Sequence, residues 1–146
     1  MEELEQKMKE VLATTFTMYL KAHQFHWNVV GPNFAEYHSY LGDLYTEIHA
    51  SIDTTAEEIR QLNAFAPAGY RRYMTLSRIP DTDGIPENSR QMIWNMWQSN
   101  EIVIKLLLET RAVAEAVNAY STVNYLDDRL SAHRKHAWML NSFLKE

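Results

Sequence analysis

Glycine and proline, the residues that most often interrupt helices and strands, are confined almost entirely to two short segments of this chain. Gly31 and Pro32 lie in the first segment, and all the others except Gly42 lie between Pro67 and Pro86. The uninterrupted stretches that remain are about 30 residues long, several times the length of an ordinary strand. The chain is therefore expected to be built from a few long helices.

Apolar residues recur at steps of three and four residues in each of these stretches, as they do along the buried face of a helix. The pattern predicts helices over residues 3–29, 34–64, 88–118 and 122–144. Segment 65–87 is expected to be a crossover, with a short helix around residues 70–77. Because the crossover is long enough to span a bundle, the sequence predicts an all-α, ferritin-like four-helix bundle forming a single domain over residues 1–146.

Composition and charge exclude several classes of protein. The chain has 14 lysines and arginines against 19 aspartates and glutamates, a net charge of -5, which is unlike a basic nucleic-acid-binding module. It has no cysteine, so any metal must be held by histidine, aspartate and glutamate. We find no signal peptide and no run of about 18 apolar residues, and therefore expect a soluble cytoplasmic protein without membrane contact.

Four side chains are candidate metal ligands: His26 near the end of the first expected helix, and His38, Asp53 and Glu57 on the second. The Glu-x-x-His pairs of di-iron centres inside a bundle do not occur in the sequence. Asp53 and Glu57 are one helical turn apart, so their carboxylates share a face and can share a cation. His38 and Asp53, however, are 15 residues apart, roughly 22 Å along one helix, and cannot bind the same ion within one chain.

Two copies of the second helix, packed antiparallel about a two-fold axis near residues 46 and 47, would remove this difficulty. His38 of one chain would then meet Asp53 and Glu57 of the other, and the symmetry would create two equivalent sites. If these residues are ligands, the spacing predicts a metal site between subunits. His49, one turn before Asp53, is a further candidate that could supplement or replace a ligand.

Three blocks of the sequence carry a resemblance to a known family. Residues 26–34 (HWNVVGPNF), followed by His38 and by residues 53–60 (DTTAEEIR), resemble the Dps family of mini-ferritins, the DNA-binding proteins from starved cells. Residues 128–140 are similar to the last helix of that family. The resemblance implies a hollow homododecamer that oxidises Fe(II), preferably with hydrogen peroxide, protects against oxidative stress and stores the Fe(III) mineral.

The resemblance also implies a role for each residue of the site. It assigns His26 and His38 to one subunit and Asp53 and Glu57 to its partner, all as iron ligands at a ferroxidase centre. Trp27, beside the centre, matches a tryptophan that can be oxidised in place of free solutes. Zinc and manganese are substitutes for iron that such a ligand set admits.

The chain departs from the family pattern in places. Gly42 stands where the family usually has an acidic residue, four positions after the second histidine. Where acids line the family's three-fold pores, the chain has Ala119 and Asn124, although it keeps Asp127 and Asp128. The first ten residues hold four glutamates against two lysines, so we expect DNA binding to be weak or absent, and association with the nucleoid stays open.

Two other functions remain open. His23, His26 and His136 are candidate ligands of a mononuclear zinc or nickel enzyme built on a helical bundle. Alternatively, the chain is an architectural nucleoid protein without ferroxidase activity. The sequence does not decide between peroxide and oxygen as the oxidant.

Overall fold

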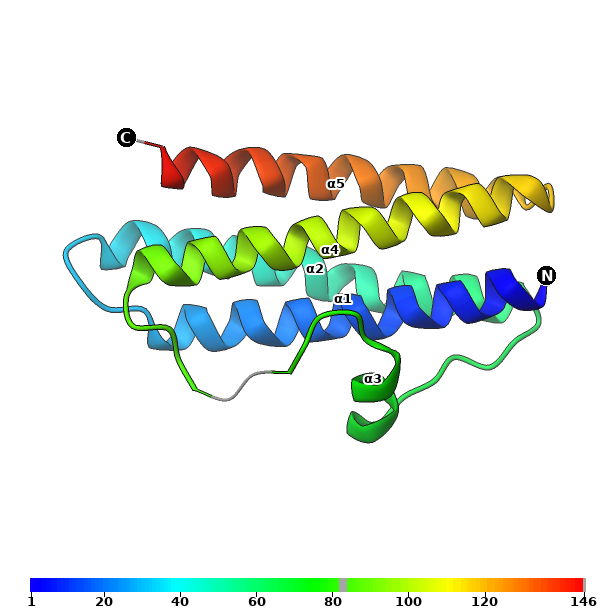
Figure 1. Cartoon of the computed structure of the whole chain (residues 1–146), viewed down its shortest axis with the longest axis horizontal. Helices are drawn as coiled ribbons and strands as arrows, with labels where there is room; N and C mark the ends of the chain where they lie inside the picture. The colour runs from blue at the N-terminus through cyan, green and yellow to red at the C-terminus, as the bar shows by residue number, and fades with distance from the viewer. Residues whose placement is uncertain (82–83, 146) are drawn as a thin grey trace.

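Four long helices and one short helix are present in the computed structural model, which describes residues 1–81 and 84–145 (Figure 1). The elements, in chain order, are α1 (Glu2–Asn28), α2 (Phe34–Gln61), α3 (Tyr70–Leu76), α4 (Ser89–Ala116) and α5 (Tyr120–Leu144). The long helices lie side by side, and α3 packs on the outside of α1. The predicted all-α four-helix bundle is confirmed, as is the short helix in its crossover.

The connections determine which helices are antiparallel. A short turn joins α1 to α2, and another joins α4 to α5, so each pair forms an antiparallel hairpin with extensive contact (Figure 1). Because the crossover returns along the length of the bundle, α2 and α4 run in the same direction. This topology leaves one face of α1 and α2 without a neighbouring long helix.

Apolar side chains from the four long helices fill the centre of the bundle. They occur at helical spacing, so each helix contributes one stripe to a shared core. The largest side chains that are fully buried are Leu4, Met8, Leu12, Met18, Leu41, Leu44, Ile48, Ile59, Ile93, Met96, Leu106 and Leu107. Burial of these stripes fixes the rotation of α1 and α2, and with it the direction of their polar side chains.

Three helices end earlier than the sequence predicted: α1 by one residue, at Asn28, and α2 and α4 by more, with an asparagine as the reason in these two. Helix α2 ends at Gln61 rather than 64, and α4 ends at Ala116 rather than 118. Asn63 and Asn118 have left-handed backbone conformations, with φ of 68° and 59°. The following amides bond back to Ile59 and Ala114, which completes a Schellman motif at each end.

The beginnings of α4 and α5 differ from the prediction as well. Helix α4 begins at Ser89 because the Asn88 side chain accepts a hydrogen bond from the Gln91 amide and caps it. Helix α5 begins at Tyr120 instead of 122, directly after the motif that ends α4. Thr122 is buried inside the first turn of α5 rather than capping it.

The helices within residues 1–81 and 84–145 include long ones, but a helix that crosses a bilayer must also be apolar over most of its length. None of the helices in these two ranges is both long enough and apolar enough to cross a membrane.

Candidate metal centre

His26 and His38 lie against each other where α1 ends and α2 begins. Their rings are stacked, with centroids 3.8 Å apart and planes 16° from parallel. Nδ1 of His26 lies 2.7 Å from the His38 carbonyl oxygen, and Nδ1 of His38 lies 2.7 Å from the His26 carbonyl oxygen. Because a carbonyl only accepts, each Nδ1 carries the proton and donates, which leaves the Nε2 lone pair of each ring available to a metal.

Gly42 allows the His26 ring to approach α2 closely. A Cβ atom added at Gly42 would lie 3.1 Å from Cε1 and 3.2 Å from Nδ1 of His26, so a side chain here would require the ring to shift by a few tenths of an ångström. The same ring donates to the His38 carbonyl, which holds it in this position. Glycine, in place of the expected acidic residue, accommodates the ring without such a shift.

Asp53 and Glu57 form the second group, near the other end of α2. Both side chains are exposed on one face of the helix. Protonated Glu57 donates a hydrogen bond to Asp53, and this bond, together with the negative charge of Asp53, raises the pKa of Glu57. Two carboxylates one helical turn apart repel each other, and a cation held between them would remove this repulsion.

The four predicted ligands therefore form two pairs rather than one cluster. The 15 residues from His38 to Asp53 lie within the single helix α2, so the pairs are separated by roughly 22 Å. Within residues 1–81 and 84–145, no group of three histidine, aspartate or glutamate side chains is arranged to hold a metal ion. Each pair on its own supplies too few ligands for a closed site.

Aromatic side chains surround the histidine pair. The His23 ring stacks on Tyr45 at 3.9 Å and lies 4.0 Å from the Trp27 ring. Nδ1 of His23 is 3.1 Å from the Tyr19 hydroxyl, and burial, followed by the nearby charges of His26 and His49, lowers the pKa of His23. Trp27 itself is 61% exposed, next to His26 in the chain and on the rim of this aromatic group.

A partly buried polar cluster that the sequence did not indicate lies between α2, α4 and α5. Arg129 donates to both carboxylate oxygens of Glu47, and His136 Nε2 lies 2.6 Å from the same carboxylate. His133 bonds to Asn100 and lies 3.1 Å from Arg129. The Arg129 guanidinium thus balances the charge of the Glu47 carboxylate, and the two imidazoles have hydrogen-bond partners within the cluster. These groups therefore do not need a metal to pair them.

His133 gives stability a dependence on pH. Burial, with smaller contributions from Arg129 and His136, lowers the pKa of His133 well below its ordinary value of 6.5, whereas Glu47 acts in the opposite sense. His133 therefore binds a proton in the unfolded chain at a pH at which it stays neutral in the folded protein. As a result, the free energy of unfolding falls as the pH decreases below about 6.5. We expect the thermal midpoint of the metal-free protein to decrease between pH 7.5 and 5.5, and His133→Asn to reduce this slope. An identical slope in the variant would contradict the assignment to His133.

His23, His26 and His136, the ligand set of the mononuclear alternative, are not brought together. His23 and His26 lie on the α1 surface that faces Tyr45, whereas His136 is bonded to Glu47 on the side of α2 that faces α5. A zinc or nickel site built from these three residues is therefore not supported.

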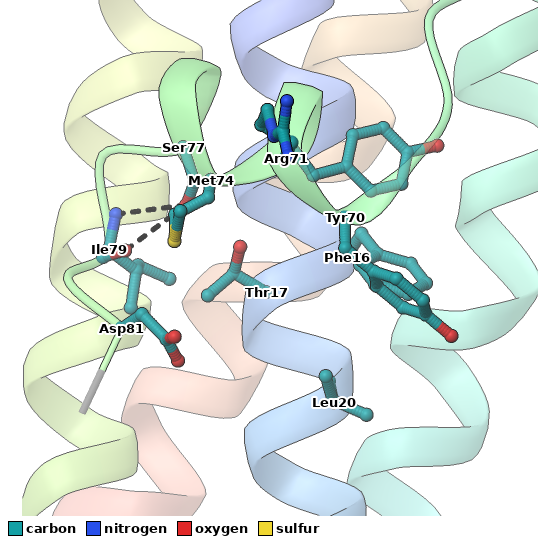
Figure 2. A pocket seen from close by; sticks show the side chains of 10 residues that line it. Phe16, Thr17, Leu20, Tyr70, Arg71, Met74, Ser77, Ile79 and Asp81 are labelled. Atoms are coloured by element: carbon teal, nitrogen blue, oxygen red, sulfur yellow. Dashed lines mark hydrogen bonds between the residues drawn. The ribbon is translucent and has the colours of Figure 1, made fainter. Parts of the chain in front are cut away.

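A groove with a mostly apolar lining lies elsewhere, between α1 and the crossover. It has a volume of about 390 Å³, and Figure 2 shows Phe16, Leu20, Tyr70 and Met74 among the side chains around it. Hydrogen bonds between Ser77 and the backbone of Ile79 hold the chain at one side of the groove. None of the four predicted metal ligands lines it.

Comparison with known proteins gives consistent matches over nearly the whole chain. The model of the ferritin-like domain matches residues 5–146. A DNA protection during starvation protein from Brevibacillus brevis is 31% identical over 134 residues, covering 92% of this chain and 89% of that protein. The crystal structure of a Dps protein from Bacillus brevis superposes with a TM-score of 0.93 at 29% identity, covering 99% of this chain and 96% of the other.

A second solved structure extends the comparison. The Dps protein from Vibrio cholerae O1, described as a member of a broad superfamily of ferritin-like diiron-carboxylate proteins, superposes with a TM-score of 0.92 at 26% identity. The superposition covers 99% of this chain and 90% of the Vibrio cholerae protein. The similarity thus includes both hairpins and the crossover.

Proposed function

Because the chain belongs to the Dps family of ferritin-like proteins, we propose that it is an iron-storage protein with ferroxidase activity, which oxidises Fe(II) at sites shared between two subunits. The Fe(III) product is stored inside a hollow homo-oligomer, a dodecamer built from two-fold dimers. One observation carries this proposal: a pair of imidazoles whose Nε2 atoms are available to a metal lies at the beginning of α2, and a pair of exposed carboxylates lies towards its end, so that neither pair completes a site within one chain.

A two-fold axis across α2 would bring the histidine pair of one subunit next to the carboxylate pair of the other. With antiparallel copies of α2 crossing near residues 46 and 47, His38 of one subunit faces the Asp53 and Glu57 turn of the other. His26 accompanies His38, because each is bonded to the other's backbone. Every contact of such an interface occurs twice, so each dimer contains two equivalent sites.

Exposed apolar side chains beside the histidine pair favour an interface there. Trp27 is 61% exposed and Phe34 is 45% exposed, and their rings lie against His23 and His38. Large exposed apolar side chains that lie together are typical of surfaces that a partner covers.

The ligand chemistry suits ferrous iron as the substrate. Imidazole nitrogen favours Fe(II), and carboxylate oxygen stabilises the harder Fe(III) that is formed. With hydrogen peroxide as the oxidant, two Fe(II) supply two electrons and two protons are consumed, which gives two Fe(III) and two waters. Because both electrons pass to peroxide, no hydroxyl radical is released, and Trp27 is placed to reduce a radical that does form.

Removal of the carboxylates tests this function. We expect Asp53→Asn with Glu57→Gln to slow Fe(II) oxidation by at least about a hundredfold, because even the outer hydrogen-bond partners of metal ligands contribute about 10- to 100-fold. The measurement is the rise in absorbance at about 300–350 nm after Fe(II) and peroxide are mixed with the metal-free oligomer. Glu101→Gln, an exposed glutamate on α4, is the control. Unchanged oxidation in the double variant would exclude these carboxylates.

A further inference from the structure

We propose that the partner's His49 is a further metal ligand of the shared site and lies against α2 at Gly42, which has no side chain, next to His26. This inference rests on the proposed function, because it needs the dimer across α2. It adds a third imidazole to two imidazoles and two carboxylates.

The first argument is the position of His49 on α2. His49, Asp53 and Glu57 follow one another at steps of four residues, so they form a continuous exposed stripe along the helix. The His49 ring packs against Tyr19, with centroids 4.8 Å apart. No residue in the described part of the chain forms a hydrogen bond with this ring, so both nitrogens are available to another partner.

The second argument is the register of the dimer. The two-fold axis that places His38 opposite the partner's turn from Asp53 to Glu57 also determines which partner residues lie opposite every other residue of α2. Gly42 lies one turn after His38, so it falls opposite the preceding turn of the partner, from His49 to Asp53. Any dimer that completes the proposed site therefore also brings the partner's His49 to Gly42.

The third argument is the lack of a side chain at Gly42. Apart from its chain neighbours and the backbone of its own helix, a Cβ built there has only two atoms of His26 within 4 Å among the described residues. Gly42 therefore adds no side chain to this part of α2, and His26 is the side chain next to it. A side chain from the partner can approach this part of α2 without meeting a side chain of residue 42.

The added imidazole has a chemical consequence. A site with more nitrogen donors favours borderline divalent ions such as Fe(II), Co(II) and Zn(II) over the hard ions Mg(II) and Ca(II), which prefer oxygen. We therefore expect His49 to contribute both to affinity and to discrimination against Mg(II).

Cobalt binding tests the assignment without relying on iron oxidation. Metal-free oligomer is titrated with Co(II) in the absence of Fe(II), and the visible absorption of the bound ion reports its ligands. We expect His49→Ala to weaken Co(II) binding by about 10- to 100-fold, to shift the visible bands and to leave the mass of the oligomer unchanged. Added imidazole should restore the bands in part. If His49→Ala fails to assemble, His49→Gln, which keeps the polarity and approximate size of the side chain, is measured instead.

The other outcomes separate this inference from the proposed function. Identical Co(II) affinity and spectra in wild type and His49 variants, together with loss of binding in Asp53→Asn/Glu57→Gln, would overturn the role of His49 and leave the shared site intact. Co(II) binding that does not depend on Asp53 and Glu57 would contradict both proposals.

Discussion

Two variants that are each inactive are expected to regain iron oxidation when they assemble with one another. One variant carries His26→Ala and His38→Ala, and the other carries Asp53→Asn and Glu57→Gln. In a mixed dimer, one of the two sites lacks all four ligands, whereas the other has the histidines of one subunit and the carboxylates of its partner and is complete. A homodimer of either variant has no complete site.

The size of the recovery follows from random pairing. When equal amounts of the two subunits are co-expressed, half of the dimers are mixed and one site in each is complete, so we expect about a quarter of the wild-type rate. Oligomers containing both subunits are isolated through two different affinity tags, and their oxidation of Fe(II) by peroxide is followed by absorbance.

The control uses two variants that remove ligands from the same half of the site. Subunits with His26→Ala and subunits with His38→Ala never form a complete site in any combination, and their mixture should stay inactive. Sites contained within single chains would leave the first mixture inactive as well, and that result would exclude the shared centre.

Removal of Glu47 is expected to cause the largest loss of stability among single substitutions of polar residues. Glu47→Ala leaves Arg129, which is 8% exposed, and His136, which is 7% exposed, without their carboxylate. Removing one partner of a fully buried ion pair costs about 3–5 kcal/mol, but the Glu47 side chain is 38% exposed and partly screened by water. We therefore expect a loss of about 2 kcal/mol, measured as a decrease in the thermal midpoint at a fixed protein concentration.

Glu115→Ala is the matched control for Glu47→Ala. It removes an arginine partner of the same kind, because Glu115 pairs with Arg111, but the Glu115 side chain is 64% exposed. Pairs of this kind contribute about 0–1 kcal/mol. Equal shifts of the midpoint in the two variants would show that burial of Arg129 and His136 does not matter.

Glu47 also makes the stability of the fold depend on pH in the acidic range. Hydrogen bonds from His136 and Arg129 outweigh the effect of burial and lower the pKa of Glu47 below its ordinary value. Its stabilising contribution is therefore complete above about pH 4.3 and is lost as the pH falls further, towards the pKa in the folded state. This loss occurs at lower pH than the loss associated with His133, so the two residues affect different parts of the pH profile.

Much of the fold was predictable because its signals are local. The absence of glycine and proline over long stretches and the helical spacing of apolar residues predict the long helices, and the length of the crossover predicts their topology. The helix ends were predicted less well, by one to three residues. Their signal was also local, since an asparagine in the left-handed conformation at 63 and at 118 is a common way to end a helix.

The candidate site was predictable in part. The spacing of His38 and Asp53 on one helix requires two subunits if both bind one ion, and that argument needs no tertiary structure. The stacking of His26 on His38 and the close approach of His26 to Gly42 depend on how α1 packs against α2. The pairing of Glu47 with Arg129 joins residues 82 positions apart, and nothing in the local sequence around either residue indicates it.

The reciprocal hydrogen bonds between His26 and His38 determine which ligands lose side-chain entropy when a metal ion binds. Each imidazole is already fixed by the other's main chain before an ion arrives, so neither has rotamer freedom left to lose. Asp53 and Glu57 are exposed and have more freedom, and ordering a flexible side chain costs about 0.5–1.5 kcal/mol. When the four ligands close around an ion, most of the side-chain entropy is therefore lost by Asp53 and Glu57, whereas His26 and His38 are already held in place.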